Sequence, residues 1–394
     1  MTGILTPPRM DSSAPEPGPS PSIAMTVPEA VRTMVAEPRF RRLVRTFAGP
    51  AAEMILHSAD AANTELEFQA TLGKLFLDVI VAKTSLGFEY QVPAQFREQP
   101  ACLFISNHRD IVLDTALLND ALIANGKPVP HVAIGDNLLQ TPWMIAFYRL
   151  CRAFVIRREL TGKQLYEQSR RVSEFVRNAI GRGEPVWMAQ RPGRTKDGAD
   201  KTEPGLLRML LLAYERATPS ENDAPLYVTP VAVSYEIEPC DVFKAAAGIG
   251  AETKNASPDR ARRDAAHIVR GILQPKGRIA LTIRPPILAD DGEGRCRGNN
   301  RADSIAALAQ RVDQEIAAGY RIWSTNYLAH DLLHGSNEFS DRYNADEQAA
   351  FESYVTRRAT EIVADPKDAR VALLSLYARP VDPQSTLASA AVAS

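Results

Sequence analysis

Apolar and polar positions follow two different periods along the middle of the chain. Between residues 100 and 290, short apolar runs are separated by segments with apolar residues three and four positions apart; the runs are ACLFIS, HVAIG, AFVI, PVWMA, LYVTPVAVSY and RIALTI. Short runs of this kind are typical of buried strands, and the longer periodic segments of helices. We expect helices at 110–123, 162–180 and 204–216. The alternation predicts an α/β fold with a mixed sheet flanked by helices.

Helical patterns lie on both sides of this central region. Residues 29–84 and 303–380 carry apolar positions at helical spacing, so they are predicted to be helical N- and C-terminal extensions of a domain over 85–290. Residues 1–28 hold seven of the 28 prolines, with Ser and Gly between them, and are expected to be a disordered leader. Residues 381–394 have a low-complexity composition typical of a flexible tail.

One stretch of the N-terminal helical segment is both basic and amphipathic. It combines four apolar residues with four arginines: Phe40, Leu43, Val44 and Phe47 beside Arg39, Arg41, Arg42 and Arg45. This composition is typical of a helix that lies on an anionic membrane surface. It suits equally well a helix that packs on the protein body and exposes its arginines to solvent. Both interpretations stay open at this point.

Composition and charge narrow the class of protein. The 45% hydrophobic and 24% charged fractions of the 394 residues are those of an ordinary globular protein. A net charge of -1 gives no reason to expect nucleic acid as a partner. The four cysteines form no CxxC pair, so we expect reduced thiols and neither a zinc knuckle nor a redox dithiol.

Two features of the sequence bear on location. The N-terminus carries prolines and acids where a secretory signal needs a basic start and an apolar stretch. No uncharged apolar run reaches the roughly 18 residues that a membrane-crossing helix needs. We therefore expect a cytoplasmic protein, peripheral on the inner face of the membrane.

The first chemical signal is the segment NHRDIVLD. His108 falls in the loop that leaves a buried strand, where α/β proteins place catalytic groups. Asp110 and Asp114 are four residues apart, and on the predicted helix they share one face beside this loop. A carboxylate there can fix the imidazole tautomer and leave the other ring nitrogen free as a general base. The alternative is that Asp110 caps the helix and His108 is an ordinary loop residue.

The second signal is a concentration of positive charge. Between residues 149 and 216 there are 15 Lys and Arg against 8 Asp and Glu. Five cations follow predicted strands, namely Arg157, Arg158, Arg191, Arg194 and Lys196. Arginine at such positions suits capture of a phosphate, and Gly193 would let the backbone approach it closely. A merely solvated basic helix is the weaker interpretation, because the arginines cluster at strand ends.

Two further groups of residues have a composition or spacing that could suit a ligand. Apolar residues after the HVAIG run could seat a fatty chain: Leu138, Leu139, Pro142, Trp143, Met144 and Phe147. His330 and His334 are four apart on a predicted helix, a spacing at which two imidazoles can bind zinc. Asp331 stands where a metalloprotease has Glu, and no downstream ligand is evident, so we predict no metal site.

Taken together, the motifs resemble those of a known family, the glycerol-3-phosphate and 1-acylglycerol-3-phosphate (lysophospholipid) acyltransferases. NHRDIVLD looks like the family's His–Asp block, and AFVIRR, preceded by AIGDNLLQTPW, like its second block in the glycerol-3-phosphate branch. RPGRTKDG resembles the third block, and YVTPVAVSY with Pro230 the fourth. The resemblance covers roughly residues 95–245 and rests on the common order of four motifs.

The resemblance implies a function and roles for the residues. His108 would deprotonate the hydroxyl of glycerol-3-phosphate or a lysophospholipid, which attacks an acyl thioester directly, while Asp114 orients the imidazole, with Asp110 as the second choice. The cations and Gly193 would bind the acceptor's phosphate. Acyl-CoA or an acyl-carrier-protein thioester would be a co-substrate, so no cofactor or metal is implied. The expected partners are these substrates and a membrane surface.

Two departures from the family pattern keep an alternative open. Five residues separate His108 from Asp114, one more than in the family. The Glu of the third block is replaced by Pro192 or Arg191, depending on the alignment. The alternative function is therefore a non-catalytic lipid-binding relative with the same fold.

Overall fold

The computed structural model describes residues 22–60, 62–216, 225–253, 260–290 and 301–381. Most of the predicted leader and nearly all of the predicted tail therefore lie outside the described residues. Within the leader's predicted bounds, helix α1 (Val27–Ala36) already begins at Val27, because Thr26 and Glu29 form a capping box at its start.

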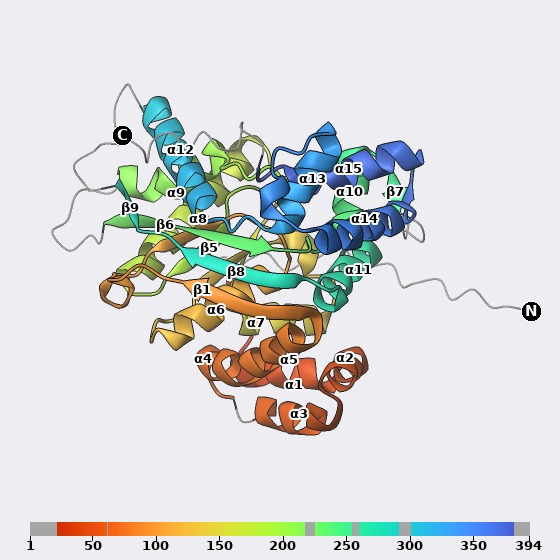
Figure 1. Ribbon diagram of the computed structural model, residues 1–394. Helices are drawn as coiled ribbons and strands as arrows, with labels where there is room; N and C mark the ends of the chain where they lie inside the picture. The colour runs from red at the N-terminus through yellow and green to blue at the C-terminus, as the bar shows by residue number, and fades with distance from the viewer. Residues whose placement is uncertain (1–21, 61, 217–224, 254–259, 291–300, 382–394) are drawn as a thin grey trace, which may run out of the picture.

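A mixed sheet forms the centre of the molecule (Figure 1). Its strands are β1 (Ser85–Gln91), β2 (Leu103–Ser106), β3 (His131–Gly135), β4 (Ala153–Ile156), β5 (Val186–Ala189), β6 (Leu226–Tyr235), β8 (Gly277–Ile283) and β9 (Ile287–Asp290). The order is β1-β8-β6-β2-β5-β3-β4, with β9 also beside β6. Strands β2 to β6 run parallel, whereas β8 and β9 pair antiparallel with β6. The predicted α/β fold with a mixed sheet flanked by helices is confirmed.

Proline in the middle of β6 is explained by the pairing of that strand. Residues 226–228 pair with β9, and residues 231–235 pair with β8. Pro230 lies where the antiparallel neighbour changes from one strand to the other, and its carbonyl faces that side, where it accepts from the Arg284 N–H. On that side the missing N–H interrupts no continuous ladder, while the pairing with β2 on the other side runs through Pro230.

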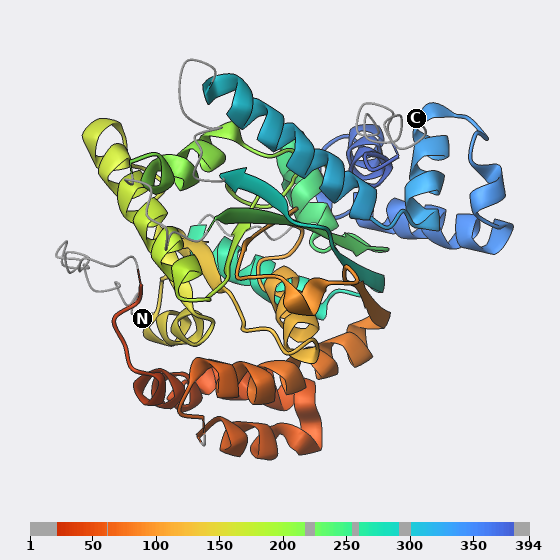
Figure 2. The ribbon, with the colours of Figure 1, turned by 90° about the vertical axis from the view of Figure 1, so that its left-hand side faces the viewer.

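Helices cover both faces of the sheet (Figures 1 and 2). They are α6 (Leu113–Ala124), α7 (Pro142–Leu150), α8 (Gly162–Gly181), α9 (Pro204–Arg216), α11 (Arg260–Leu273) and α12 (Arg301–Gly319). The alternation along β2 separates the two cores, since successive side chains point to opposite faces. Leu103 and Ile105 pack with α8, α9 and α12, whereas Phe104 packs with α6 and α11.

The N-terminal extension is a small helical unit with its own core. Its helices are α1, α2 (Pro38–Ala48), α3 (Ala52–Asp60), α4 (Glu65–Phe68) and α5 (Lys74–Thr84). Apolar side chains from α1 to α4 pack together and against Ala146 and Leu150 of α7. The unit is thereby joined to the sheet side that carries α6 and α7.

The C-terminal helices pack on α10 (Asp241–Gly248), which follows β6. They are α13 (Ser324–His334), α14 (Ala345–Ala359) and α15 (Pro366–Ala378), and they share one core with Val242 and Ala245 of α10. A short antiparallel pair, β7 (Glu252–Thr253) with β10 (Ile362–Val363), adds a second link. The C-terminal region is thus packed on the segment that leaves the sheet beside the His108 loop.

Candidate active site

The loop that carries His108 leaves the C-terminal end of β2. Asn107, which is fully buried, holds the loop onto β6: its side-chain oxygen accepts from the Val233 N–H at 2.8 Å, and its side-chain nitrogen donates to the Val233 carbonyl at 3.0 Å. A side-chain amide here replaces the backbone pairing that ends at Ser106. The loop therefore leaves the sheet from a fixed point.

His108 and Asp114 form a hydrogen-bonded pair. The His108 Nδ1 lies 2.9 Å from Asp114 Oδ2, and the same oxygen accepts from the backbone N–H groups of Arg109 at 2.6 Å and Asp110 at 2.9 Å. The other carboxylate oxygen accepts from the Tyr235 hydroxyl at 2.8 Å. The Asp114 side chain is fully buried. Four contacts fix the carboxylate. Because it faces His108 Nδ1, it favours the imidazole tautomer with the proton on Nδ1 and leaves Nε2 as the basic nitrogen.

Burial and the Asp114 charge raise the pKa of Tyr235 well above its ordinary value. The phenol therefore stays protonated and keeps donating to Asp114. The His108 ring also meets the Trp187 ring edge-on at 5.7 Å between centroids. Trp187 is held in turn by a 3.0 Å hydrogen bond from its ring nitrogen to the Ser106 hydroxyl.

Asp110 does not lie on the helix, contrary to the prediction. Helix α6 begins at Leu113, because the Asp110 carboxylate accepts from the Val112 and Leu113 N–H groups, each at 2.9 Å, and closes the turn before the helix. Asp110 thus shares no helix face with Asp114, and its carboxylate is engaged by these two amides. The structure places Asp110 in the turn that precedes the helix and brings Asp114 to the imidazole.

A cavity of about 1310 Å³ lies beside His108. One part of its surface, the basic lining, consists of all five predicted cations: Arg157, Arg158, Arg191, Arg194 and Lys196. Another part, the apolar lining, comes from the N-terminal helices and from α7: Phe40, Leu43, Val44, Phe68, Leu72, Phe76, Leu77, Trp143, Met144 and Phe147. The volume exceeds the roughly 300–1,000 Å³ of pockets for drug-sized ligands. A long apolar chain with an anionic group matches this combination of surfaces.

Arg157 and Arg158 directly follow β4 and are exposed. The Gln168 side chain of α8 bonds to both the N–H and the carbonyl of Arg157 at 2.9 Å and so fixes this turn. The Arg158 guanidinium lies over Gly135, where a Cβ would be 2.5 Å from Arg158 Nε. Glycine at the end of β3 is therefore required for this arginine position.

The loop after β5 carries the remaining cations and is tied to the His108 loop. The Thr195 N–H donates to the His108 carbonyl at 3.1 Å. Arg194 donates through Nη2 to His267 Nδ1 at 2.9 Å, and its Nη1 is buried with no hydrogen-bond partner among the described residues. Gly193 has φ +77°, a conformation that a side chain would strain, and it also lines the cavity.

The segment that carries this site matches a known protein family. The family model of the acyltransferase domain matches residues 87–234. That range holds both partners of the His108–Asp114 pair and the whole basic lining. Residues 87–234 are therefore similar to the acyltransferase domain of that family.

Curated relatives of the acyltransferase domain are glycerol-3-phosphate acyltransferases of Xylella fastidiosa. Those of strains 9a5c and M12 are each 26% identical over 247 residues, which is 59% of this chain. The match spans only 27% of the length of each relative. The 1-acyl-sn-glycerophosphate acyltransferase of Thermotoga maritima aligns with a TM-score of 0.38 at 12% identity, over 70% of this chain and 95% of that one.

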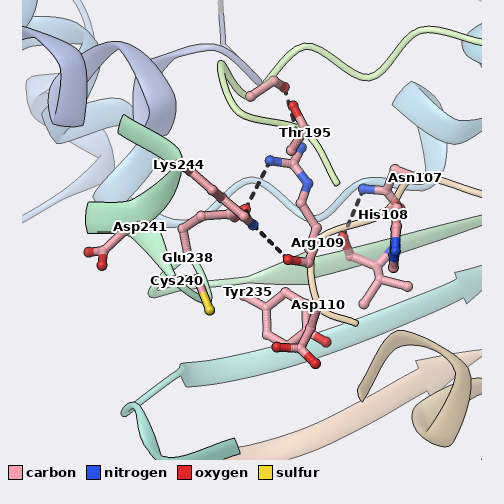
Figure 3. A network of polar contacts seen from close by, with 12 residues as sticks. Asn107, His108, Arg109, Asp110, Thr195, Tyr235, Glu238, Cys240, Asp241 and Lys244 are labelled. Atoms are coloured by element: carbon pink, nitrogen blue, oxygen red, sulfur yellow. Dashed lines mark hydrogen bonds and ion pairs between the residues drawn. The ribbon is translucent and has the colours of Figure 1, made fainter. Parts of the chain in front are cut away.

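Behind the His108 loop of the acyltransferase domain lies a buried ion network that the sequence did not reveal (Figure 3). Arg109 points away from the cavity: its guanidinium pairs with Asp200 and lies 3.5 Å from Glu238, over the Tyr320 ring. Lys244 donates to Glu238 at 2.5 Å. Arg109 is 91 residues from Asp200 and 129 from Glu238 in the chain, so no local spacing could have indicated these two contacts.

The described residues contain no metal site: nowhere among them do three His, Cys, Asp or Glu side chains lie close enough together to bind one ion. The rings of His330 and His334 lie 4.6 Å apart. The Asp331 carboxylate accepts from the Glu338 and Phe339 N–H groups and from Ser336 and Tyr343 hydroxyls, so it stabilises a turn.

Two cysteines and the helices bear on the remaining expectations. Cys102 is buried, which raises its thiol pKa to about 12, and Cys296 lies outside the described residues. Among the described helices, none has the length and apolarity to span a bilayer.

Proposed function

We propose that the acyltransferase domain transfers a fatty acyl group from an acyl thioester to the hydroxyl of glycerol-3-phosphate or a lysophospholipid. The observation that carries this proposal is that one cavity joins His108, the basic lining and the apolar lining. An acyl chain needs the apolar surface, an acceptor phosphate needs the cations, and the reacting hydroxyl needs a base near both. The names of the curated relatives support the same acceptor class.

In the proposed reaction, His108 Nε2 accepts the proton of the acceptor hydroxyl as its oxygen attacks the thioester carbonyl. The tetrahedral intermediate then collapses, the C–S bond breaks, and the thiolate takes the proton back from the imidazolium. The Asp114 carboxylate stabilises the imidazolium through the 2.9 Å contact to Nδ1. The ester forms in one attack on the thioester, so no acyl-enzyme, metal or cofactor takes part in this scheme.

The basic lining supplies the positioning in this scheme. Gln168 fixes the backbone turn that carries Arg157 and Arg158, and His267 orients the Arg194 guanidinium. This turn and this guanidinium are therefore in place before substrate arrives. Binding the acceptor's phosphate there would place its hydroxyl near the thioester and convert binding free energy into rate. We assign phosphate binding to the five cations and close backbone approach to Gly193.

The two departures from the family pattern have different structural consequences. The longer His–Asp spacing is compatible with the mechanism, because Asp114 still contacts His108 Nδ1. At the third block, Pro192 lies exposed on the cavity surface, and Arg191 is paired with Asp197 at 3.4 Å. A substrate contact that the family's Glu provides is therefore not reproduced by either residue.

We further propose that the protein works at an anionic membrane surface through α2. Phe40 and Val44 of this helix face the core of the N-terminal unit, whereas Arg39, Arg42 and Arg45 are exposed. Leu43 and Phe40 also line the cavity, so the same helix borders the proposed acyl site. A lipid acceptor could thus enter from the membrane into the apolar lining. The Arg45 pairing with Glu53 at 2.8 Å lowers the charge available on that face.

The test is thiol release from palmitoyl-coenzyme A, with glycerol-3-phosphate or lysophosphatidic acid as acceptor, in the wild type and in His108→Ala. We expect release that depends on one acceptor and is lost in the variant. The same assays are repeated with an acyl-carrier-protein donor. Silence with both donors, together with binding of lysophosphatidic acid vesicles, would refute the enzyme and favour the non-catalytic lipid-binding relative. Full turnover by His108→Ala would refute the base assignment.

A further inference from the structure

Lys244 on α10 is buried behind the His108 loop, ten residues beyond the region that matches the family model. Its side chain is 3% exposed. Its ammonium group donates to the Arg109 carbonyl at 2.6 Å and to Glu238 Oε1 at 2.5 Å (Figure 3). A buried lysine is costly to keep charged, so its partners indicate what it does. One partner is a backbone group next to His108.

The carbonyl that Lys244 binds belongs to the peptide unit that joins Arg109 to Asp110. The N–H of this unit donates to Asp114 Oδ2 at 2.9 Å. Asp114 Oδ2 in turn contacts His108 Nδ1. The contacts therefore run in one chain, from the ammonium through a peptide unit to the carboxylate and then to the imidazole. An ammonium on the carbonyl polarises the peptide and strengthens its N–H as a donor.

The preceding peptide unit, between His108 and Arg109, is held in the same way. Its carbonyl accepts from the Thr195 N–H at 3.1 Å, and its N–H donates to Asp114 Oδ2 at 2.6 Å. The two peptide units that flank Arg109 thus both direct their N–H groups toward Asp114. Each is fixed at the opposite end by another segment of the chain, and Lys244 provides the only charged donor among these four contacts.

We propose that Lys244 is a positioning residue for the His108–Asp114 pair, acting through the peptide unit between Arg109 and Asp110. This inference rests on the proposed acyl transfer. Lys244 does not touch the cavity; it holds the backbone that supplies one of the amides to Asp114. The role differs from that of Arg109, whose guanidinium closes the far side of the network on Asp200.

The structure also connects Lys244 to the C-terminal helices. Glu238, its second partner, has its backbone N–H bonded to the Tyr377 hydroxyl of α15 at 3.1 Å. Tyr377 also donates to Asp241, which pairs with Arg358 of α14 at 2.6 Å. Helices remote from the cavity thereby fix the segment from which Lys244 reaches the loop.

The experiment compares Lys244→Met, which removes the ammonium, with Lys244→Arg, which retains a cation. Because Lys244→Met leaves Glu238 short of a partner, Lys244→Met/Glu238→Gln is made as well. The matched control is Lys127→Met, which removes a lysine bond of 2.6 Å to the Gln99 carbonyl away from the cavity. We expect kcat to fall about tenfold in both Lys244→Met proteins, with KM for donor and acceptor within twofold, partial recovery in Lys244→Arg and no change in the control.

Two readouts separate positioning from a loss of fold. The first is the proton resonance of His108 Nδ1–H in protein labelled with ¹⁵N-histidine, which reports the bond to Asp114 without any turnover. It should shift in Lys244→Met and stay unchanged in Lys127→Met. The second is the Asp114→Asn background, where Lys244→Met should change kcat less than twofold because the pathway is already broken.

The outcomes that overturn the inference are distinct from those that overturn the acyltransferase. An unchanged His108 resonance in Lys244→Met refutes the positioning role. The role is also refuted if Lys244→Met lowers kcat by the same factor in the Asp114→Asn background as in the wild type. If the wild type transfers no acyl group to any acceptor, the proposed function fails, and the resonance then decides the positioning role alone.

Discussion

Replacing Tyr235 with Phe tests whether the Asp114 carboxylate must be fixed at both oxygens. The substitution keeps the ring in its buried place at the end of β6 and removes only the hydroxyl. Oδ1 then loses the 2.8 Å bond from Tyr235, while Oδ2 keeps the N–H groups of Arg109 and Asp110 and the contact to His108. Asp114 is 1% exposed, so water cannot easily replace the lost donor.

The size of the effect follows from the charge on the acceptor. A hydrogen bond to a charged group contributes about 1.5–3 kcal/mol, and a buried acceptor left without a donor costs a similar amount. If this entire hydrogen-bond free energy were lost from the transition state, kcat would fall about 10- to 150-fold. Three contacts on Oδ2 remain and retain most of the orientation, so we expect a fall of about tenfold, with KM unchanged.

The assay is acyl transfer at saturating substrates, with the free energy of unfolding measured beside it. Tyr343→Phe is the matched control, because the Tyr343 hydroxyl also donates at 2.8 Å to a buried carboxylate, that of Asp331, away from the cavity. Both variants should lose a similar amount of stability, and only Tyr235→Phe should lose kcat. If Tyr235→Phe keeps kcat within twofold of the wild type, the argument that Asp114 needs both oxygens held is wrong.

Three further predictions follow from contacts at other places. Arg157→Ala should raise KM for the phosphorylated acceptor at least tenfold with little change for the thioester donor; an equal rise for both would mean that the cations bind the donor's phosphates. Gly271→Ala should destabilise the protein by about 1–3 kcal/mol in a thermal melt, because a Cβ at this position would lie 2.1 Å from Asp110 Oδ2. Gly181→Ala in α8 is the control: the space around Gly181 is open, so the melting temperature should not fall. Burial and Arg152 lower the pKa of His131 from its ordinary value, so the unfolded chain binds protons at this site more readily than the folded chain. Stability should therefore fall as the pH drops through the ordinary His pKa of about 6.5. His131→Asn should lose less of its melting temperature between pH 7 and 5, and an identical loss would contradict the assignment.

The sequence predicted those parts of the fold whose pattern is strong over a whole element. The strand LYVTPVAVSY and the helix 204–216 have the predicted bounds, because long apolar or amphipathic runs leave little choice. Strand β1 was not predicted, since it is an edge strand with mostly exposed side chains and no apolar run. The start of α6 was placed too early, because an Asp carboxylate competing for backbone N–H groups leaves no trace in the hydrophobic pattern.

For the site, local spacing indicated the right segments and missed the supporting contacts. The basic lining could be predicted because its cations follow strands that end at one edge of the sheet. Tyr235 could have been suspected from its place at the end of β6, beside the strand that precedes His108. Lys244 could not, because its contact to Arg109 joins residues 135 apart and depends on how α10 packs.

The altered spacing between His108 and Asp114 shows what such a pair requires in physical terms. An extra residue inside a helix would rotate everything after it by about 100° and carry the carboxylate away from the imidazole. Here the extra length falls before α6, in a turn that Asp110 closes on Val112 and Leu113. Asp114 is then the second residue of α6, where side chains point back toward the N-terminus of the helix and hence toward the loop. The pair is therefore preserved by where the helix begins, and the count of intervening residues matters only through that position.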